Sequence, residues 1–200
     1  MSTWVAAIVE TRGRPDFWDV ARGIGVESTK KDVPPYVVIS CDASFDMTAV
    51  FTLSKDLSAA LATTVIGFVI QTGVDTHFTH VYRDGVLIRR LEYEREGDHW
   101  IAVEGTAQPW EPAYFFGKEL GEEDWPDMLW DEISDADLAR YQKARTAGAI
   151  GDAIDLIHPS STAPMHRVCE RLGIPGGTAS GTWSPPRRSL WSRFFGDPKN

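Results

Sequence analysis

The stretch HVYRDGVLIRRLEYEREGDHWIAVEGTAQPWE, residues 80–111, carries the strongest fold signal in this chain of 200 residues. Asp84-Gly85 stands between two runs rich in Val, Ile, Leu and Tyr, which is the pattern of a β-hairpin with a two-residue turn. Gly97-Asp98 then separates the second run from HWIAVEG. The stretch therefore predicts three strands that follow one another as an antiparallel meander.

A two-residue turn also fixes the register of the hairpin. It places Tyr82 opposite Leu87 and His80 opposite Arg89 on the same face of the sheet. An antiparallel sheet usually buries one face against helices. A helix that covers this meander is therefore expected nearby in the chain.

The uncharged segment LSAALATTVIGFVIQTGV, Leu57 to Val74, is the expected cover. Its apolar residues recur at helical spacing, Ser54 stands where an N-cap would, and Gly73 can end a helix. Five Ser, Thr and Gln side chains make the segment too polar for a span that faces lipid. We expect a buried core helix.

The remaining segments complete an α+β fold. Short β-branched or aromatic runs predict strands at 3–10, 36–41 and 49–53, and a short helix lies between Pro15 and Gly25. The chain becomes irregular after Gly105, and helices follow at 134–148, 149–157 and 161–173, with the first capped by Ser134 and Gly148. We expect a sheet domain at 1–117, a helical region packed on it at 118–175, and a linker with an extended tail at 176–200.

Composition argues against several classes of partner and cofactor. The formal net charge is −9 and the pI is about 5.0, which disfavours nucleic acid and anionic membrane as partners. Cys41 and Cys169 are the two cysteines, and neither has a second ligand at metal-binding spacing. We expect free thiols, no metal, no cofactor and no export signal, and therefore a cytoplasmic protein.

An enzyme alternative centres on the predicted hairpin. A guanidinium next to an imidazole favours the neutral imidazole, so His80 opposite Arg89 could act as a base, with Glu104 or Glu111 as the orienting carboxylate. Against this reading, no nucleophile and no second His stands at a fixed spacing from the pair. A cross-strand pair without catalytic function is the simpler interpretation.

Trp110 is the second candidate. Pro109 precedes it and Pro112 follows Glu111, so the indole is held in a rigid turn. A fixed indole can form the wall of a ligand site, and it can equally cover the end of a sheet or lie in a subunit contact.

VCERLGIPGGTASG, residues 168–181, resembles the turn of a helix-turn-helix, which implies DNA binding. The resemblance covers about fourteen residues. Glycines at 176, 177 and 181 and the Pro185-Pro186 pair leave no recognition helix after the turn. DNA binding is therefore the second alternative. His166 and Cys169 lie three residues apart on the helix before this turn, where a structural role is expected for both.

Charge is distributed unevenly toward the C-terminus. The segment from Glu119 to Asp137 is acidic and contains Trp125 and Trp130, whereas the tail is basic and aromatic. Large apolar groups such as Trp183 are not expected to stay in water, so we expect the tail to dock on the acidic segment, within one chain or in a homodimer. The residues of the tail predicted to bind are Arg187, Arg188, Trp191, Arg193 and Phe194.

Taken as a whole, the sequence predicts a binding or interaction protein without chemistry of its own, such as an inhibitor, an immunity-type protein or an adaptor. Its partner would be another protein or a second copy of the chain. The alternatives are a small enzyme with a pocket over the sheet that uses His80, Arg89 and Glu111, and a DNA-binding protein.

Overall fold

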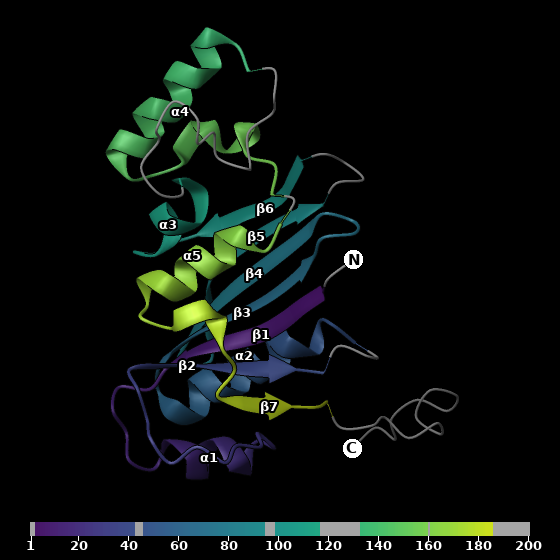
Figure 1. Cartoon of the computed structure of the whole chain (residues 1–200), viewed down its shortest axis with the longest axis vertical. Helices are drawn as coiled ribbons and strands as arrows, with labels where there is room; N and C mark the ends of the chain where they lie inside the picture. The colour runs from purple at the N-terminus through teal and green to yellow at the C-terminus, as the bar shows by residue number, and fades with distance from the viewer. Residues whose placement is uncertain (1–2, 43–45, 95–98, 117–132, 160, 186–200) are drawn as a thin grey trace, which may run out of the picture.

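The protein folds around one seven-stranded sheet with helices on both faces (Figure 1). This computed structural model describes residues 3–42, 46–94, 99–116, 133–159 and 161–185. The strands are β1 (Thr3–Glu10), β2 (Tyr36–Cys41), β3 (Thr64–Gln71), β4 (Thr76–Arg83), β5 (Val86–Glu94), β6 (His99–Gly105) and β7 (Gly181–Trp183). The α-helices are α1 (Phe17–Gly23), α2 (Ala49–Leu61), α3 (Glu111–Phe116), α4 (Asp135–Ala147) and α5 (Ala163–Arg171), and the 3-10 helices are η2 (Gly151–Leu156) and η3 (Pro175–Gly177). The fold is α+β, as the sequence predicts.

The strands lie in the order β6-β5-β4-β3-β1-β2-β7. Strands β3 to β6 form an antiparallel meander, which includes the three strands predicted from residues 80–111. Strand β1 lies between β2 and β3 and is antiparallel to both. Strand β7 is parallel to β2 and forms the far edge of the sheet.

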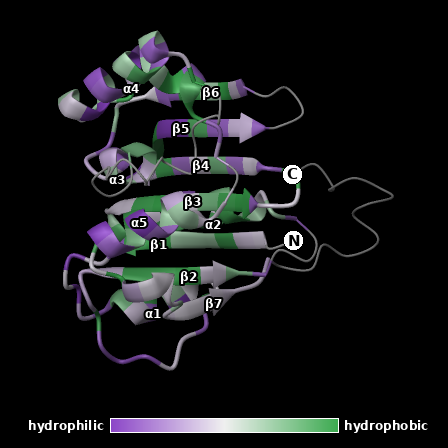
Figure 2. Ribbon diagram, turned by 45° about the horizontal axis from the view of Figure 1, so that its top comes forward, coloured by the Kyte–Doolittle hydropathy of each residue, from purple (hydrophilic) through white to green (hydrophobic). Residues whose placement is uncertain are grey.

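Each face of the sheet has its own hydrophobic core. Helices α3 and α5 cover one face, which we call the α5 face, and α1 and α2 cover the other, the α2 face (Figure 1). Alternate residues of β1 show the division, since Ala6 and Ile8 belong to the α5 core while Ala7 and Val9 belong to the α2 core. Figure 2 shows hydrophobic residues along β2 and β3, between the two helical layers.

The predicted β4–β5 hairpin is confirmed. Asp84 and Gly85 have φ angles of 52° and 78°, as a two-residue turn of this kind requires. Tyr82 pairs with Leu87, as expected. Beyond that pair, however, the ladder shifts by one residue at a β-bulge, where β5 inserts Ile88.

The bulge makes the predicted pairing of His80 with Arg89 wrong. His80 pairs with Arg90, and Arg89 pairs with Val81. Because successive side chains of a strand point to opposite faces, a shift of one residue moves Arg89 to the face opposite that of His80. Arg89 lies on the α5 face, and His80 lies on the α2 face against Phe51 of α2.

The predicted helix from Leu57 to Val74 is wrong in its boundaries. Helix α2 begins at Ala49, in a run predicted as a strand, and ends at Leu61. Ala62 takes a left-handed conformation with φ of 50°, and β3 begins at Thr64. Ser54 is a buried interior residue whose hydroxyl donates to the carbonyl of Val50, so it is not an N-cap.

The composition of β3 explains the error. TVIGFVIQ is rich in β-branched and aromatic residues, which favour a strand. The six central residues are buried because both faces of the strand are covered, so the alternation of a half-buried strand is missing. None of the helices in the described residues is long and apolar enough to cross a membrane.

The helices predicted in the C-terminal half are confirmed with small changes in their bounds. Ser134 caps α4 by accepting a hydrogen bond from the amide of Asp137, and Gly148 ends the helix in a left-handed conformation. Pro164 stands in the first turn of α5. The short helix α3 was not predicted, since the segment after Gly105 was expected to be irregular.

The segment expected to be an irregular linker before the tail contains β7. Trp183 is buried in the α2 core, and its indole nitrogen donates to the carbonyl of Ile24 at 3.2 Å. Trp183 is therefore part of the sheet rather than of a tail. The docking of the tail and the homodimer stay predictions, because the other residues concerned lie outside the described ones. These are Trp125, Trp130, Arg187, Arg188, Trp191, Arg193 and Phe194.

Candidate functional site

A pocket of about 410 Å³ opens on the α5 face of the sheet. It lies over the first residues of β2 and β3 and the last residues of β1 and β4, which meet at one end of the sheet because neighbouring strands are antiparallel. The turn before α3 and the C-terminal end of α5 form its other sides. The lining residues are Ile8, Glu10, Tyr36, Thr64, Ile66, Arg83, Gln108, Pro109, Trp110, Arg171 and Leu172.

The apolar part of the pocket comes from the α5 core. Ile8 and Ile66 are buried members of that core on neighbouring strands, and they pair directly across β1 and β3. Trp110 is also buried in it, and within the described residues its indole nitrogen has no hydrogen-bond partner. Trp110 thus has a core position, which was the alternative to a ligand site expected from the sequence, and its role as the wall of a ligand site stays a prediction.

A buried ion pair fixes the turn that carries Trp110. Arg89 donates from Nε to Glu111 Oε1 and from Nη2 to Oε2, both at 2.8 Å. Oε1 of Glu111 also accepts the amide of Gln108 at 2.7 Å. Arg89 Nη1 lies within reach of the carbonyls of Glu104 and Gly105, at 3.3 and 3.2 Å. Both charged side chains are only 6% exposed, so the pair positions the wall of the pocket without lining it.

The rim of the pocket carries charged groups. Glu10 lies 3.4 Å from Arg12 Nε and accepts from Thr63. Arg83 donates to Thr64 Oγ1 at 3.4 Å and makes no ion pair with any described residue. Arg171, at the end of α5, makes neither a hydrogen bond nor an ion pair within the described part of the chain. The rim therefore offers two guanidinium groups that no described carboxylate neutralises.

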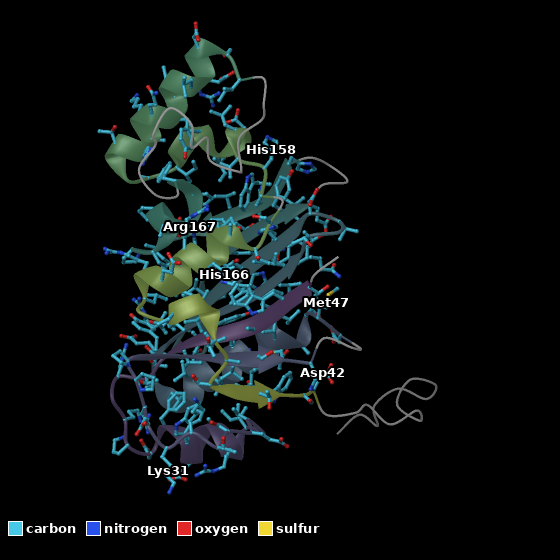
Figure 3. All side chains as sticks on the ribbon, viewed as in Figure 1. Lys31, Asp42, Met47, His158, His166 and Arg167 are labelled. Carbon is cyan, nitrogen blue, oxygen red and sulfur yellow. The ribbon has the colours of Figure 1, made fainter. Side chains whose placement is uncertain are left out.

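Sequence reasoning missed both of these arginines. Arg171 follows Arg167 by four residues on α5, which places the two on the same side of the helix. Arg167 donates to the carbonyls of Ala113 and Tyr114 at 2.9 and 3.0 Å, which ties α5 to α3. Figure 3 shows Arg167 and His166 on α5 in front of the sheet. The spacing of the two arginines was the signal that could have indicated a basic side of this helix.

The structure brings Arg89 and Glu111 together but separates them from His80. Nε2 of His80 lies 2.6 Å from Glu92 Oε1, and Arg90 Nη2 donates to the other oxygen of Glu92 at 2.5 Å. The imidazole stacks on Phe51 with 3.8 Å between ring centroids. The three residues of the enzyme alternative thus lie on two faces of the sheet, and none of them lines the pocket.

Burial sets the protonation of this histidine. Desolvation lowers the pKa of His80 below its ordinary value of 6.5, although Glu92 opposes the change. Burial also works against the charge of Glu92, but hydrogen bonds from Arg90 and His80 outweigh it and lower the pKa of the carboxyl group. Both shifts favour a neutral imidazole beside a carboxylate, and the two side chains are 12% and 9% exposed.

The lowered pKa of His80 predicts a loss of stability in weak acid. The unfolded chain binds a proton near pH 6.5 and the folded chain only at lower pH, so the contribution is complete above pH 6.5 and is lost as the pH falls toward the folded pKa. His80→Gln should therefore flatten the decline in unfolding free energy between about pH 7.5 and pH 5. Urea denaturation across this range measures it.

The matched control is His99→Gln, which removes an exposed histidine from β6 and should retain the decline seen in the unmodified chain. A decline of the same size in His80→Gln would show that other groups cause it.

The remaining candidates lie on or near α5. His166 stacks on Trp4, with ring centroids 4.5 Å apart, and burial raises the pKa of the Cys169 thiol to about 12. Cys169 is buried in the α5 core rather than on the helix surface, and a structural role for both residues stays a prediction. After α5, the chain continues into η3 and β7, so the described part of the helix-turn-helix-like segment contains no recognition helix.

No cluster of three or more His, Cys, Asp or Glu side chains in the described residues could hold a metal ion. Comparison with known proteins adds no functional information, because no protein-family model, curated protein or solved structure matches this chain. The pocket on the α5 face is therefore the feature that best defines a candidate site.

Proposed function

We propose that this chain is a binding protein whose ligand site is the pocket on the α5 face. The observation that carries the proposal is the arrangement of its lining: an apolar floor from Ile8, Ile66 and Trp110 beneath a polar, charged rim. Small-molecule sites combine these two features, at volumes of roughly 300–1,000 Å³. The pocket falls within that range.

The way the walls are held supports the proposal. The Arg89–Glu111 pair and the hydrogen bonds from Arg167 to α3 anchor the turn and the helix that enclose the pocket. A site with fixed walls loses less conformational entropy on binding than a flexible one. The binding of a protein partner, as an inhibitor, immunity-type protein or adaptor, rests on segments outside the described residues and stays a prediction.

The enzyme and DNA-binding alternatives have less support. His80 is on the opposite face from the pocket. Arg89 and Glu111 form two hydrogen bonds with each other, so these donors and acceptors are not directed at a substrate. A segment that ends in a three-residue strand does not provide the helix that a major groove accepts.

A variant that fills the pocket tests the proposal. Thr64 lines the pocket at the start of β3, where an aromatic residue is compatible with a strand, so Thr64→Trp should occupy part of the cavity. Fluorine NMR with a library of fluorinated fragments should detect binders to the unmodified chain. We expect these fragments to lose binding to Thr64→Trp.

The matched control is Thr76→Trp, at the opposite end of the meander, which should keep the binders. Circular dichroism should show that both variants are folded. Fragments that bind Thr64→Trp as well as the unmodified chain would place the binding site elsewhere and contradict the proposal, as would a library without a single binder.

A further inference from the structure

We infer that the ligand of this pocket is a small organic anion: one carboxylate or sulfonate group on an apolar, preferably aromatic, body. The inference rests on the proposed function, because it names the class of ligand for the same site. It is carried by Arg83 and Arg171, which stand on the rim of the pocket on separate elements.

The lack of a nearby carboxylate distinguishes Arg83 and Arg171 from most other arginines in the described part of the chain. The guanidinium groups of six other arginines lie within 4.0 Å of a carboxylate, and they belong to Arg12, Arg14, Arg22, Arg89, Arg90 and Arg140. The whole chain has 29 Asp and Glu against 20 Lys and Arg, so carboxylates are in excess. Among the described residues, Arg83 and Arg171 therefore differ from these six in having no carboxylate partner.

The guanidinium groups of Arg83 and Arg171 favour an anionic ligand. A guanidinium presents several N–H donors in a plane and matches the oxygens of a carboxylate or phosphate. Arg83 uses only a long 3.4 Å contact to Thr64, and Arg171 makes no hydrogen bond or ion pair with a described residue, so the donors of both can reach a ligand. Both side chains are exposed, so each contact is screened by water and adds a modest amount to affinity.

The rest of the lining selects the body of the ligand. Half-buried Tyr36 and Leu172 present an aromatic ring and apolar surface to the pocket, and buried Ile8, Ile66 and Trp110 lie beneath them. An inorganic anion would leave this surface in water, whereas an apolar body attached to the anion would cover it.

Glu10 limits the charge that the pocket accepts. Glu10 lines the pocket together with Arg83 and Arg171. Among the described residues, its negative charge is offset only by Arg12, whose Nε lies 3.4 Å from the carboxylate. The lining contains two guanidinium groups and one carboxylate, so its net charge is +1. A ligand with a single negative charge complements this lining better than a highly charged one.

The test uses two dyes that share an aromatic body. The anion 8-anilinonaphthalene-1-sulfonate carries one sulfonate, and N-phenyl-1-naphthylamine lacks it. Fluorescence titration, with stoichiometry from calorimetry, should show that one anion binds per chain and that Thr64→Trp abolishes its binding. The neutral dye should bind the unmodified chain several-fold more weakly.

Variants of the rim give the sharper result. Arg83→Gln with Arg171→Gln should weaken binding of the anion by about tenfold and leave the neutral dye unchanged. Glu10→Gln should strengthen binding of the anion by about twofold. The control is Arg22→Gln combined with Arg140→Gln, which lowers the net charge by the same amount. These residues lie on α1 and α4, outside the pocket lining, so the control should not change the affinity for either dye.

The outcomes separate this inference from the proposed function. If both dyes bind equally and the double arginine variant changes neither, the pocket binds apolar ligands and the anion inference is overturned while the proposed function stands. If the anion still binds to Thr64→Trp, the dye sits elsewhere and the inference is again contradicted. If neither dye nor any fragment binds the unmodified chain, both proposals fail.

Discussion

Replacement of Arg89 by Met is expected to lower the free energy of unfolding by about 3–5 kcal/mol, the usual cost of removing one partner from a buried ion pair. Methionine leaves the carboxylate of Glu111 enclosed without its counter-ion. It also removes the donors that face the carbonyls of Glu104 and Gly105. Denaturation in urea, followed by circular dichroism, measures the loss.

Two further variants show whether burial is the cause. Arg140 pairs with Asp155 and Asp137 but is 39% exposed, so water screens the pair and Arg140→Met should cost much less than Arg89→Met. Arg89→Met combined with Glu111→Leu removes both charges and should recover much of the stability lost in the single variant. A single variant that costs no more than Arg140→Met would mean that the pair is exposed to water in solution.

Gly67→Ala is expected to destabilise the fold by about 2–3 kcal/mol, because it inserts a methyl group where helix and sheet already touch. A Cβ at this position of β3 would lie 2.3 Å from the hydroxyl oxygen of Ser54 and 3.1 Å from its Cβ. Ser54 is fixed by its hydrogen bond to Val50 in the interior of α2. The helix would therefore have to move away from the sheet. Thermal and urea denaturation measure the cost.

A second substitution on the helix tests the geometry of this contact. Ser54→Ala removes the oxygen that meets the new methyl group, so the double variant with Gly67→Ala should be more stable than the sum of the two single changes implies. Gly23→Ala is the control, since a Cβ there meets nothing within 4 Å. Additive effects at positions 54 and 67 would mean that α2 does not pack on β3 at this glycine.

The local features of the fold could be predicted from the sequence. Asp84-Gly85 specifies its turn through positive φ angles, and Ser134 and Gly148 bound α4 through hydrogen bonds to nearby backbone. In each case the residues that fix the conformation are neighbours in the chain. The same reasoning singled out Trp110 from the prolines near it in the sequence, and Trp110 is among the residues that line the pocket.

The tertiary structure decided the features that depend on contacts between residues far apart in the sequence. Because β3 is buried on both faces, its sequence lacks the alternation that would have distinguished a strand from the end of α2. The bulge at Ile88 places Arg89 on the face of the sheet where it pairs with Glu111. Arg83 and Arg171 are 88 positions apart in the printed numbering, and only the packing of α5 on the sheet brings them to one rim. Periodicity and turn chemistry act over a few residues, whereas a pocket is formed by contacts between segments whose separation in the sequence carries no signal.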